Sequence, residues 1–412
     1  MKQFVVGAVC GAACIGLMYP VARGASDMET YKALDRFSQG FSIVRHDYVQ
    51  PQTDDVLVDK ALQGMAAGLD PHSSYMTQKE FEAAASTKPT AGIGLELTMS
   101  NGLVQIITPI EGTPADKAGV KSGDFIAAID GKPAQGMSLN EAIAALRGDA
   151  GSKVTLTLLR TGAHVPMDIT MTRVPIVIDT VRYERKGDVG YIRISSFNLG
   201  TDAKLKSAVD ALKKQIGPGL KGYIVDLRGN PGGLLDQGVV VSDDFLDSGE
   251  IVSTKGRNQA DNQTYRAKPG DITDGKPIVV LINESSAAAS EIVAAALQDN
   301  HRATIVGMHS FGVGTVQTII PVVPAGGAFR LTTSQFFTPS GRPIQVAGVT
   351  PDVAVSQTMA GMKADPLRAG EAGLRGHIDG PEPQSTEILY PPAGKQSGDY
   401  QLSVALERLA SR

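Results

Sequence analysis

The centre of the chain decides the fold, through the segment Tyr223-Ile224-Val225-Asp226-Leu227-Arg228-Gly229-Asn230-Pro231-Gly232-Gly233. Its first five residues form a short, mostly apolar run, which is typical of a strand buried on both faces. The Gly- and Pro-rich stretch after Arg228 favours neither strand nor helix, so it predicts a loop at the carboxyl end of that strand. A helix expected over Leu234–Leu246 completes a strand–loop–helix unit.

The same alternation extends to both sides of this unit. A strand over Val189–Ile194 and a helix over Asp202–Gln215 precede it. Apolar strands over Pro277–Ile282 and Thr304–Val306 follow it, with a loop and a helix between them. Repeated units of this kind predict an α/β layer over residues 175–355, with functional loops at the strand ends.

The region before this layer, residues 88–174, has a different pattern. Short strands such as Phe125–Ile129 and Val154–Leu159 are separated by Gly-containing turns, which predicts a separate β-rich unit. Ser138 and Glu141 have the spacing of a capping box, so a helix is expected to begin between these strands.

Residues 26–87 are predicted to be helical. Apolar residues recur at helical spacing on one face, at Leu34, Phe37, Phe41 and Val44. A second helix is expected over Asp54–Leu69. This region is interpreted either as a small helical cap or as a dimerisation arm. At the other end, residues 356–412 are expected to form a loose tail that closes with a short helix over Asp399–Leu409.

The first 25 residues have the pattern of a secretory signal peptide. Met1-Lys2-Gln3 precedes an apolar stretch over Phe4–Tyr19, and small residues follow. The sequence therefore predicts a periplasmic or secreted protein. The alternative is a retained inner-membrane anchor that faces the periplasm, the only case in which membrane contact is expected. Both cysteines, Cys10 and Cys14, lie in this segment, so the processed chain would have no thiol nucleophile.

Composition excludes several classes of function. The chain has 412 residues, a net charge of −4 and no long basic run, which argues against nucleic-acid binding. Its histidines lack metal-ligand spacing, and no phosphate-binding loop occurs, so neither a metal nor a cofactor is expected. Asp70-Pro71-His72 is interpreted as a rigid turn rather than as a site.

Several motifs occur together in the order and spacing of one protease family. They are Leu69-Asp70-Pro71-His72-Ser73-Ser74-Tyr75, Gly92-Ile93-Gly94-Leu95, Gly123-Asp124-Phe125-Ile126, Ile129-Asp130-Gly131, Asp226-Leu227-Arg228-Gly229-Asn230-Pro231-Gly232-Gly233 and Phe311-Gly312-Val313-Gly314-Thr315-Val316-Gln317. With these motifs the chain resembles the carboxyl-terminal processing peptidases, also called tail-specific serine proteases.

The resemblance implies an α/β protease core of layered strands and helices, like those of crotonase and ClpP. An inserted β-rich PDZ domain and a helical N-terminal region complete the expected fold. The implied divisions are a signal peptide at 1–25, the helical region at 26–87, the PDZ domain at 88–174, the protease core at 175–355 and the tail at 356–412.

A PDZ domain binds the C-terminal tail of another protein as an added strand and holds its carboxylate with backbone N–H groups. By resemblance, the carboxylate loop consists of Gly92, Ile93, Gly94 and Leu95. A pocket for an apolar terminal side chain would be lined by Leu97, Ile143 and Leu146. The alternative is that these three are ordinary core residues.

The family cleaves peptides with a serine nucleophile and a neutral lysine base. The serine is the middle one of Ser-Ala-Ser-Ala-Ser-Glu, which here reads Ser286-Ala287-Ala288-Ala289-Ser290-Glu291. The lysine lies in Phe-Gly-Lys-Gly-Thr-Val-Gln, which here has Val313 at that place. The nucleophile position is therefore vacant at Ala288, and the base position is vacant at Val313.

The supporting parts of the family's site are retained. Gln317, expected one helical turn after the base position, would orient the base. The backbone N–H groups of Gly232, Gly233 and Ala289 would stabilise the oxyanion. Arg228 and Glu291 keep the family's pattern and are expected to be scaffold residues.

Three interpretations follow. The chain is a pseudoprotease that binds protein C-terminal tails or regulates an active paralogue, or its dyad was removed by design. Otherwise it is an active serine endopeptidase by another route, in which Ser285, Ser286 or Ser290 attacks and His309 serves as base. The simpler interpretations are that these serines cap a helix and that His309 is a solvated loop residue. The candidate partners are C-terminal tails, a second copy of the chain, or an active paralogue.

Overall fold

The computed structural model describes residues 27–85, 91–100, 103–109, 113–121, 123–137, 139–160, 165–175, 180–324, 326–358, 370–392 and 398–410. The predicted signal peptide and the predicted cap Ser138 lie outside these ranges. By its internal packing the chain divides into two compact units, Met1–Met65 and Ala66–Arg412.

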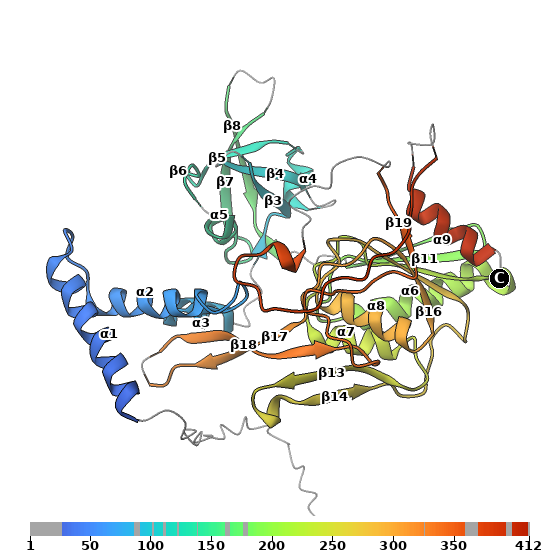
Figure 1. The fold of residues 1–412 in the computed structure, drawn as a ribbon. Helices are drawn as coiled ribbons and strands as arrows, with labels where there is room; N and C mark the ends of the chain where they lie inside the picture. The colour runs from blue at the N-terminus through green and yellow to red at the C-terminus, as the bar shows by residue number, and fades with distance from the viewer. Residues whose placement is uncertain are drawn as a thin grey trace, which may run out of the picture. The chain divides into compact units, whose positions relative to one another are not determined.

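The first unit consists of helix α1 (Asp27–Asp47) and most of helix α2 (Asp54–Ala67), which confirms the helical prediction (Figure 1). Most apolar side chains of α1 are exposed, with Phe37 at 56%, and Phe41 is half-buried. Phe37, Phe41, Val44 and Leu57 line a groove of about 330 Å³ on these helices. Of the helices in the described ranges, none is long and apolar enough to cross a membrane.

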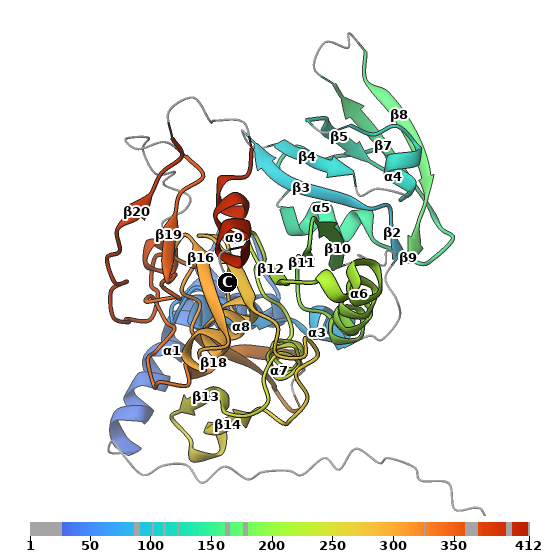
Figure 2. The same cartoon turned by 90° about the vertical axis from the view of Figure 1, so that its right-hand side faces the viewer.

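Residues 91–175 form the predicted β-rich unit (Figure 2). Its antiparallel sheet has the strand order β3-β4-β5-β7-β8, and α5 lies beside β3. The bounds are β2 (Ala91–Gly92), β3 (Leu95–Ser100), β4 (Leu103–Pro109), α4 (Pro114–Lys117), β5 (Phe125–Ile129), β6 (Lys132–Pro133), α5 (Leu139–Leu146), β7 (Lys153–Leu159), β8 (Met167–Thr172) and β9 (Val174–Pro175). Among the described strands, β3 pairs only with β4, so its other edge is open to a further strand.

The protease core is built on a second, larger sheet with the order β10-β11-β12-β15-β16-β19-β20. Only β10 runs antiparallel to its neighbour; the remaining pairs are parallel. The bounds are β10 (Val181–Lys186), β11 (Val189–Ile194), β12 (Gly222–Asp226), β15 (Ile278–Ile282), β16 (Ala303–Gly307), β19 (Val353–Val355) and β20 (Ile388–Leu389). The central strands β12 and β15 are buried throughout, because both faces of the sheet are covered, and they are apolar except for Asp226 at the end of β12.

Helices cover the two faces of this sheet (Figure 2). One face packs against α6 (Thr201–Ile216), α7 (Leu235–Asp243) and α8 (Ala289–Asp299), whose residues share the largest apolar cluster with alternate residues of β12 and β15. The opposite face packs against α9 (Tyr400–Ala410). The α/β prediction is therefore confirmed, and most predicted elements agree within two residues.

A further antiparallel sheet has no counterpart in the sequence-based prediction. Its order is β1-β18-β13-β14, with β17 also paired to β18. The bounds are β1 (Ser74–Met76), β13 (Glu250–Gly256), β14 (Gln263–Arg266), β17 (Thr315–Pro321) and β18 (Ala328–Phe337), and the short helix α3 (Gln78–Ala85) follows β1. The region predicted as helical is thus interrupted by β1, which joins the Leu69–Tyr75 motif to β18 of the core.

The prediction of a loose tail is wrong at two places within residues 370–392, although most of these residues are irregular and exposed. Within them, β20 pairs with β19 and extends the large sheet. A 3₁₀ turn at Glu371–Gly373 precedes it, and the side chain of Glu371 is fully buried. Gly- and Pro-rich composition indicates irregular backbone, but it does not exclude packing onto a core through backbone hydrogen bonds.

Candidate functional site

The candidate site lies where the loops after β12 and β15 meet. These strands are parallel neighbours, so their carboxyl ends share one edge of the sheet. Asn230, which is fully buried, ties the loops together. Its side chain donates to Ile194 O (2.9 Å), while its carbonyl accepts from Ala287 N (3.0 Å) and Ser290 Oγ (2.9 Å). The loop that would carry the nucleophile is therefore fixed by the first loop.

The nucleophile position, Ala288, has an unusual backbone conformation. Its φ of 49° and ψ of −112° are rarely adopted by a residue with a side chain and resemble the first central position of a type II′ turn. Gly232 lies directly against it. A Cβ on Gly232 would come within 2.8 Å of Ala288 Cβ and 2.9 Å of Ala289 N. The backbone at the position that the resemblance assigns to the nucleophile therefore forms a sharp turn, and its side chain carries no hydroxyl.

The Glu291 carboxylate joins the nucleophile and base positions. It is fully buried and accepts hydrogen bonds from four groups: Ala288 N (2.9 Å), Val313 N (2.9 Å), Gly312 N (2.6 Å) and Ser310 Oγ (2.6 Å). Ala288 N and Val313 N donate to the same oxygen, so the structure places the two vacant positions next to each other. Burial raises the pKa of Glu291 to about 8, against the effect of these donors.

The loop around Val313 is shaped by its two glycines. Gly312 has φ of 93°, and a Cβ there would lie 2.7 Å from Val346 O. A Cβ on Gly314 would lie 2.0 Å from Gln345 N. Val313 itself is half-buried. The backbone that would hold a lysine is therefore fully formed, while a valine side chain can neither accept nor donate a proton.

Gln317 does not follow Val313 on a helix, so that part of the prediction is wrong. It lies on β17, where β-branched Thr315 and Val316 favour a strand that pairs with β18. Its Nε2 donates to Thr315 Oγ1 (2.8 Å) and lies 3.5 Å from Thr332 Oγ1. The amide is thus held by two threonine hydroxyls.

The three predicted oxyanion donors lie in the same two loops, but they differ in their contacts. Gly232 N donates to Asn230 Oδ1 (2.8 Å), so its N–H group is engaged within the loop. Gly233 forms an isolated parallel bridge with Phe197, and Ala289 is the first residue of α8. Their role toward an oxyanion stays a prediction.

Two of the serines near Ala288 have structural roles. Ser286 and Ser290 are fully buried, and their hydroxyls donate to Leu227 O (2.8 Å) and Asn230 O (2.9 Å). Ser285 is exposed at the turn before α8. Neither hydroxyl caps α8, so the capping interpretation is wrong in detail. Both hydroxyls instead attach the turn before α8 to the loop after β12.

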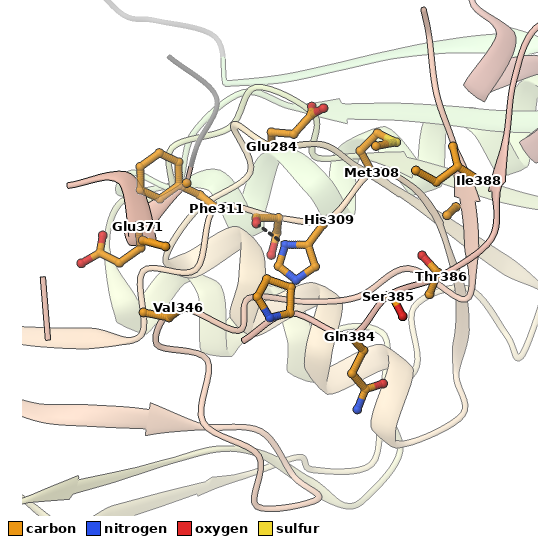
Figure 3. Close-up of a pocket in the computed structure, with 15 residues that line it drawn as sticks. Glu284, Met308, His309, Phe311, Val346, Glu371, Gln384, Ser385, Thr386 and Ile388 are labelled. Carbon is orange, nitrogen blue, oxygen red and sulfur yellow. Dashed lines mark hydrogen bonds between the residues drawn. The ribbon is translucent and has the colours of Figure 1, made fainter. Parts of the chain in front are cut away.

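His309 is not the solvated loop residue that the sequence indicates. Its imidazole projects into a pocket of about 380 Å³ that Met308 and Gln384 also line (Figure 3). Nδ1 lies 2.8 Å from Ser310 O, Nε2 is enclosed, and burial lowers the pKa of the ring. Neither Ala288 nor Val313 lines this pocket. His309 is therefore poorly placed to act as a base at Ala288.

Arg228 has the scaffold position that the sequence predicts. Its guanidinium binds Asp226 on one side and Asp399 on the other, with Asp399 Oδ1 at 2.8 Å and Oδ2 at 2.6 Å. Because Asp399 immediately precedes α9, this pair attaches the closing helix to the end of β12.

The predicted peptide-binding residues lie around β3. Gly94 has φ of 80°, and Thr113 Oγ1 donates to its carbonyl (3.2 Å). Ile93 contributes only backbone to the loop, because its side chain is 2% exposed in the domain core. Leu146 is also a core residue at 5% exposed, whereas Leu97 and Ile143 are half-buried. The core interpretation thus fits Leu146 best.

Sequence reasoning missed three residues that organise this region: Asn230, Gln345 and Glu371. Asn230 lay inside a motif that the sequence analysis quoted, and its position after a buried strand was an available signal. No local sequence signal pointed to Gln345 or Glu371, because their hydrogen-bond partners lie far away in the sequence.

Comparisons with known proteins agree with this arrangement. Residues 188–355 match the model of peptidase family S41, residues 105–160 match the PDZ domain, and residues 20–80 match the N-terminal domain of the activating protease CtpB. The carboxy-terminal-processing protease of Bartonella bacilliformis is 48% identical over 92% of this chain and 87% of its own length.

Two further relatives are also named as C-terminal processing proteases. The carboxy-terminal processing protease CtpA of Bacillus subtilis is 39% identical over 77% of this chain and 68% of its own length. The solved structure of a photosystem II D1 C-terminal processing protease is 30% identical, with a TM-score of 0.53 over 80% of this chain and 92% of its own. The chain belongs to peptidase family S41, the serine peptidases that include the carboxy-terminal processing proteases.

Proposed function

We propose that this chain is a tail-binding pseudoprotease of family S41. The observation that carries the proposal is the contrast at Ala288 and Val313. The strained turn and the shared Glu291 hydrogen bonds are kept, while the two side chains that would perform the chemistry are alanine and valine.

The family's mechanism cannot proceed on these residues. Peptide cleavage by a Ser–Lys dyad needs an oxygen that attacks the carbonyl and an amine that takes its proton. Ala288 has no heteroatom in its side chain, and neither does Val313. The hydroxyls of Ser286 and Ser290 are used by backbone carbonyls, which leaves the exposed Ser285 as the one local candidate for a substitute.

Recognition, in contrast, depends on parts that are in place. An extended tail can add to the open edge of β3, beside α5, with its carboxylate at the backbone of residues 92–95. Leu97 and Ile143 are half-buried and border that edge from β3 and α5. A protein tail that ends in an apolar residue is the ligand class that this arrangement favours.

The test uses the chain without its predicted signal peptide. Binding of a fluorescent peptide with an apolar C-terminal residue is followed by anisotropy, beside the same peptide with an amidated C-terminus. Cleavage of an unstructured protein is followed by mass spectrometry. We expect saturable binding of the free acid, weaker binding of the amide and no cleavage. Cleavage that a Ser285→Ala variant abolishes would instead establish a substitute nucleophile.

A second candidate function is assembly with another chain. The exposed apolar face of α1 and the groove bordered by Phe37, Phe41 and Val44 support it. The partner is either a second copy or an active paralogue. Analytical ultracentrifugation of the unsubstituted chain and of the Phe37→Asp variant tests whether the partner is a second copy. A dimer that dissociates in the variant supports a homodimer. If both proteins are monomers, the remaining partner is an active paralogue, which is tested by mixing this chain with the paralogue.

Localisation is part of the same proposal. We expect a periplasmic or secreted protein whose first 25 residues are removed, with retention as an inner-membrane anchor as the alternative. Cell fractionation with N-terminal sequencing of the purified chain separates the two, since an anchored form would begin at Met1 and sediment with membranes.

A further inference from the structure

A network of hydrogen bonds begins at the turn between α2 and β1. The Asp70 carboxylate, 6% exposed, accepts from the backbone N–H groups of His72 and Ser73, both at 2.9 Å, and from Ser73 Oγ at 2.6 Å. Thr332 on β18 donates to the same carboxylate (3.1 Å). The rigid turn that the sequence predicts is therefore confirmed, and it is anchored on β18.

From this turn the network reaches Glu371. His72 Nε2 lies 3.0 Å from both carboxylate oxygens of Glu371, whose side chain is fully buried. The backbone N–H of Glu371 donates to Phe311 O (2.8 Å). Glu371 therefore contacts the turn through its side chain and the loop of the base position through its backbone.

Gln345 completes the connection to that loop. Its Nε2 donates to Glu371 Oε1 (3.1 Å), and its Oε1 accepts from Gly314 N (2.9 Å). Because Gln345 is 1% exposed, water cannot replace either partner without disrupting the packing. Phe311 and Gly314, which flank Gly312 and Val313, are thus both attached to Glu371, one directly and one through Gln345.

The charges around His72 make this connection sensitive to protonation. A buried carboxylate is costly without a charged or hydrogen-bonding partner, and His72, when protonated, is the cationic partner of Glu371. The charged groups that act on His72 are Glu371, Asp70 and Arg330. The hydrogen bond and the charge of Glu371 raise the pKa of His72, while burial and Arg330 oppose the increase.

We propose that His72 is a positioning residue that holds the loop Phe311–Gly314 in place through Glu371 and Gln345. The proposal concerns the frame of the site, so it does not depend on whether the chain cleaves peptides. Since the pKa of His72 is raised by folding, its stabilising effect is fully present below the ordinary histidine pKa. That effect is lost as the pH rises through the raised value.

The test is an NMR titration of the full chain, labelled at glycine nitrogen and histidine Cε1, from about pH 5.5 to 9. We expect the Gly314 amide shift to change with the same midpoint as the His72 ring. In His72→Gln, which retains a hydrogen-bond donor but no charge, the part of the Gly314 change that has the His72 midpoint should vanish. Any step due to Glu291, which accepts from Gly312 N and Val313 N and has a pKa of about 8, should remain. Hydrogen exchange at residues 312–315 should then become about tenfold faster or more at pH 6.

The matched control is His377→Gln. His377 lies in the same segment as Glu371, but its Nδ1 contacts Leu374 O (2.9 Å) instead of the network. This variant should keep both the Gly314 titration and the slow exchange. A Gly314 amide that does not follow His72 in the unsubstituted chain would overturn the proposal, and this result needs no variant to fold. Unchanged exchange in a folded His72→Gln protein would overturn it as well.

Discussion

The carboxylate loop of the PDZ domain and the two loops of the vacant dyad differ in where their chemistry resides. In the PDZ loop, the proposed recognition would use backbone N–H groups, so Gly92–Leu95 would need only the correct φ and ψ. At the dyad, the backbone positions the groups, but catalysis resides in two side chains. Two substitutions can therefore remove catalysis while the geometry of Ala288 and Val313 survives. Binding by the PDZ loop, in contrast, is expected to be lost through substitutions that change the backbone conformation, such as one at Gly94.

The largest expected effect is on protein stability, when the Glu291 carboxylate that joins Ala288 and Val313 is changed. Glu291→Gln replaces one acceptor oxygen by an NH₂ group, which would face backbone donors at Ala288 and Val313 or at Gly312. We expect a loss of about 3 kcal/mol in the free energy of unfolding, measured by urea denaturation above the Glu291 pKa of about 8, where both oxygens of the carboxylate accept hydrogen bonds. Glu407→Gln, at an exposed position on α9, is the control and should change stability by less than about 0.5 kcal/mol.

A Glu291→Gln protein as stable as the unsubstituted chain would contradict the comparison. It would mean that the four hydrogen bonds do not hold the two loops together, and the site could not then be called a retained frame.

A smaller effect is expected in the PDZ loop, where the backbone performs the function. Gly94 and Gly119 have nearly equal φ values, 80° and 77°, but only at Gly94 would a Cβ collide with a neighbour, at 2.4 Å from Thr113. Gly94→Ala should weaken tail binding about tenfold or more, whereas Gly119→Ala should change it less than about twofold. Fluorescence anisotropy measures both. Equal losses in the two variants would show that general strain, and not the loop, controls binding.

The smallest expected effect concerns the strain at Ala288 itself. Ala288→Gly relieves a positive φ of 49° and should stabilise the chain by roughly 1 kcal/mol, although glycine is more flexible in the unfolded state. At the next residue, Ala289→Gly should destabilise by a similar amount, because it introduces glycine at the start of α8. Thermal unfolding of the two variants distinguishes a strained turn from a relaxed one. A strained turn predicts changes in stability of opposite sign in the two variants, whereas a relaxed turn predicts a loss of stability in both.

Much of the fold could be predicted from local patterns, and the reasons for the failures are physical. Buried strands such as β12 and β15 are continuous apolar runs with turn residues after them, so their bounds follow from sequence. The sequence of β18 alternates less clearly between apolar and polar residues, so this strand was not predicted. Its Thr332 and Thr333 are polar residues that make hydrogen bonds to the neighbouring strand β17. The packing of 370–392 was missed because its key contact, Glu371 with His72, spans 299 residues.

The candidate site shows the same division. Motif order located Ala288, Val313 and Gln317, but it did not reveal how they are held. The helical turn expected between Val313 and Gln317 is a strand, because Thr315–Pro321 pairs with β18. Asn230, Gln345 and Glu371 act through long-range hydrogen bonds, which no local pattern indicates.

The most direct measurement compares the chain with an Ala288→Ser/Val313→Lys double variant and the two single variants. All are incubated with an unstructured protein, and cleavage is followed by mass spectrometry at matched protein stability. If the frame is intact and only the reactive groups are absent, the double variant cuts at least about a thousandfold faster than the other three, which stay at the background rate. Cleavage by the unsubstituted chain at a similar rate, or a folded double variant that remains silent, would contradict the account.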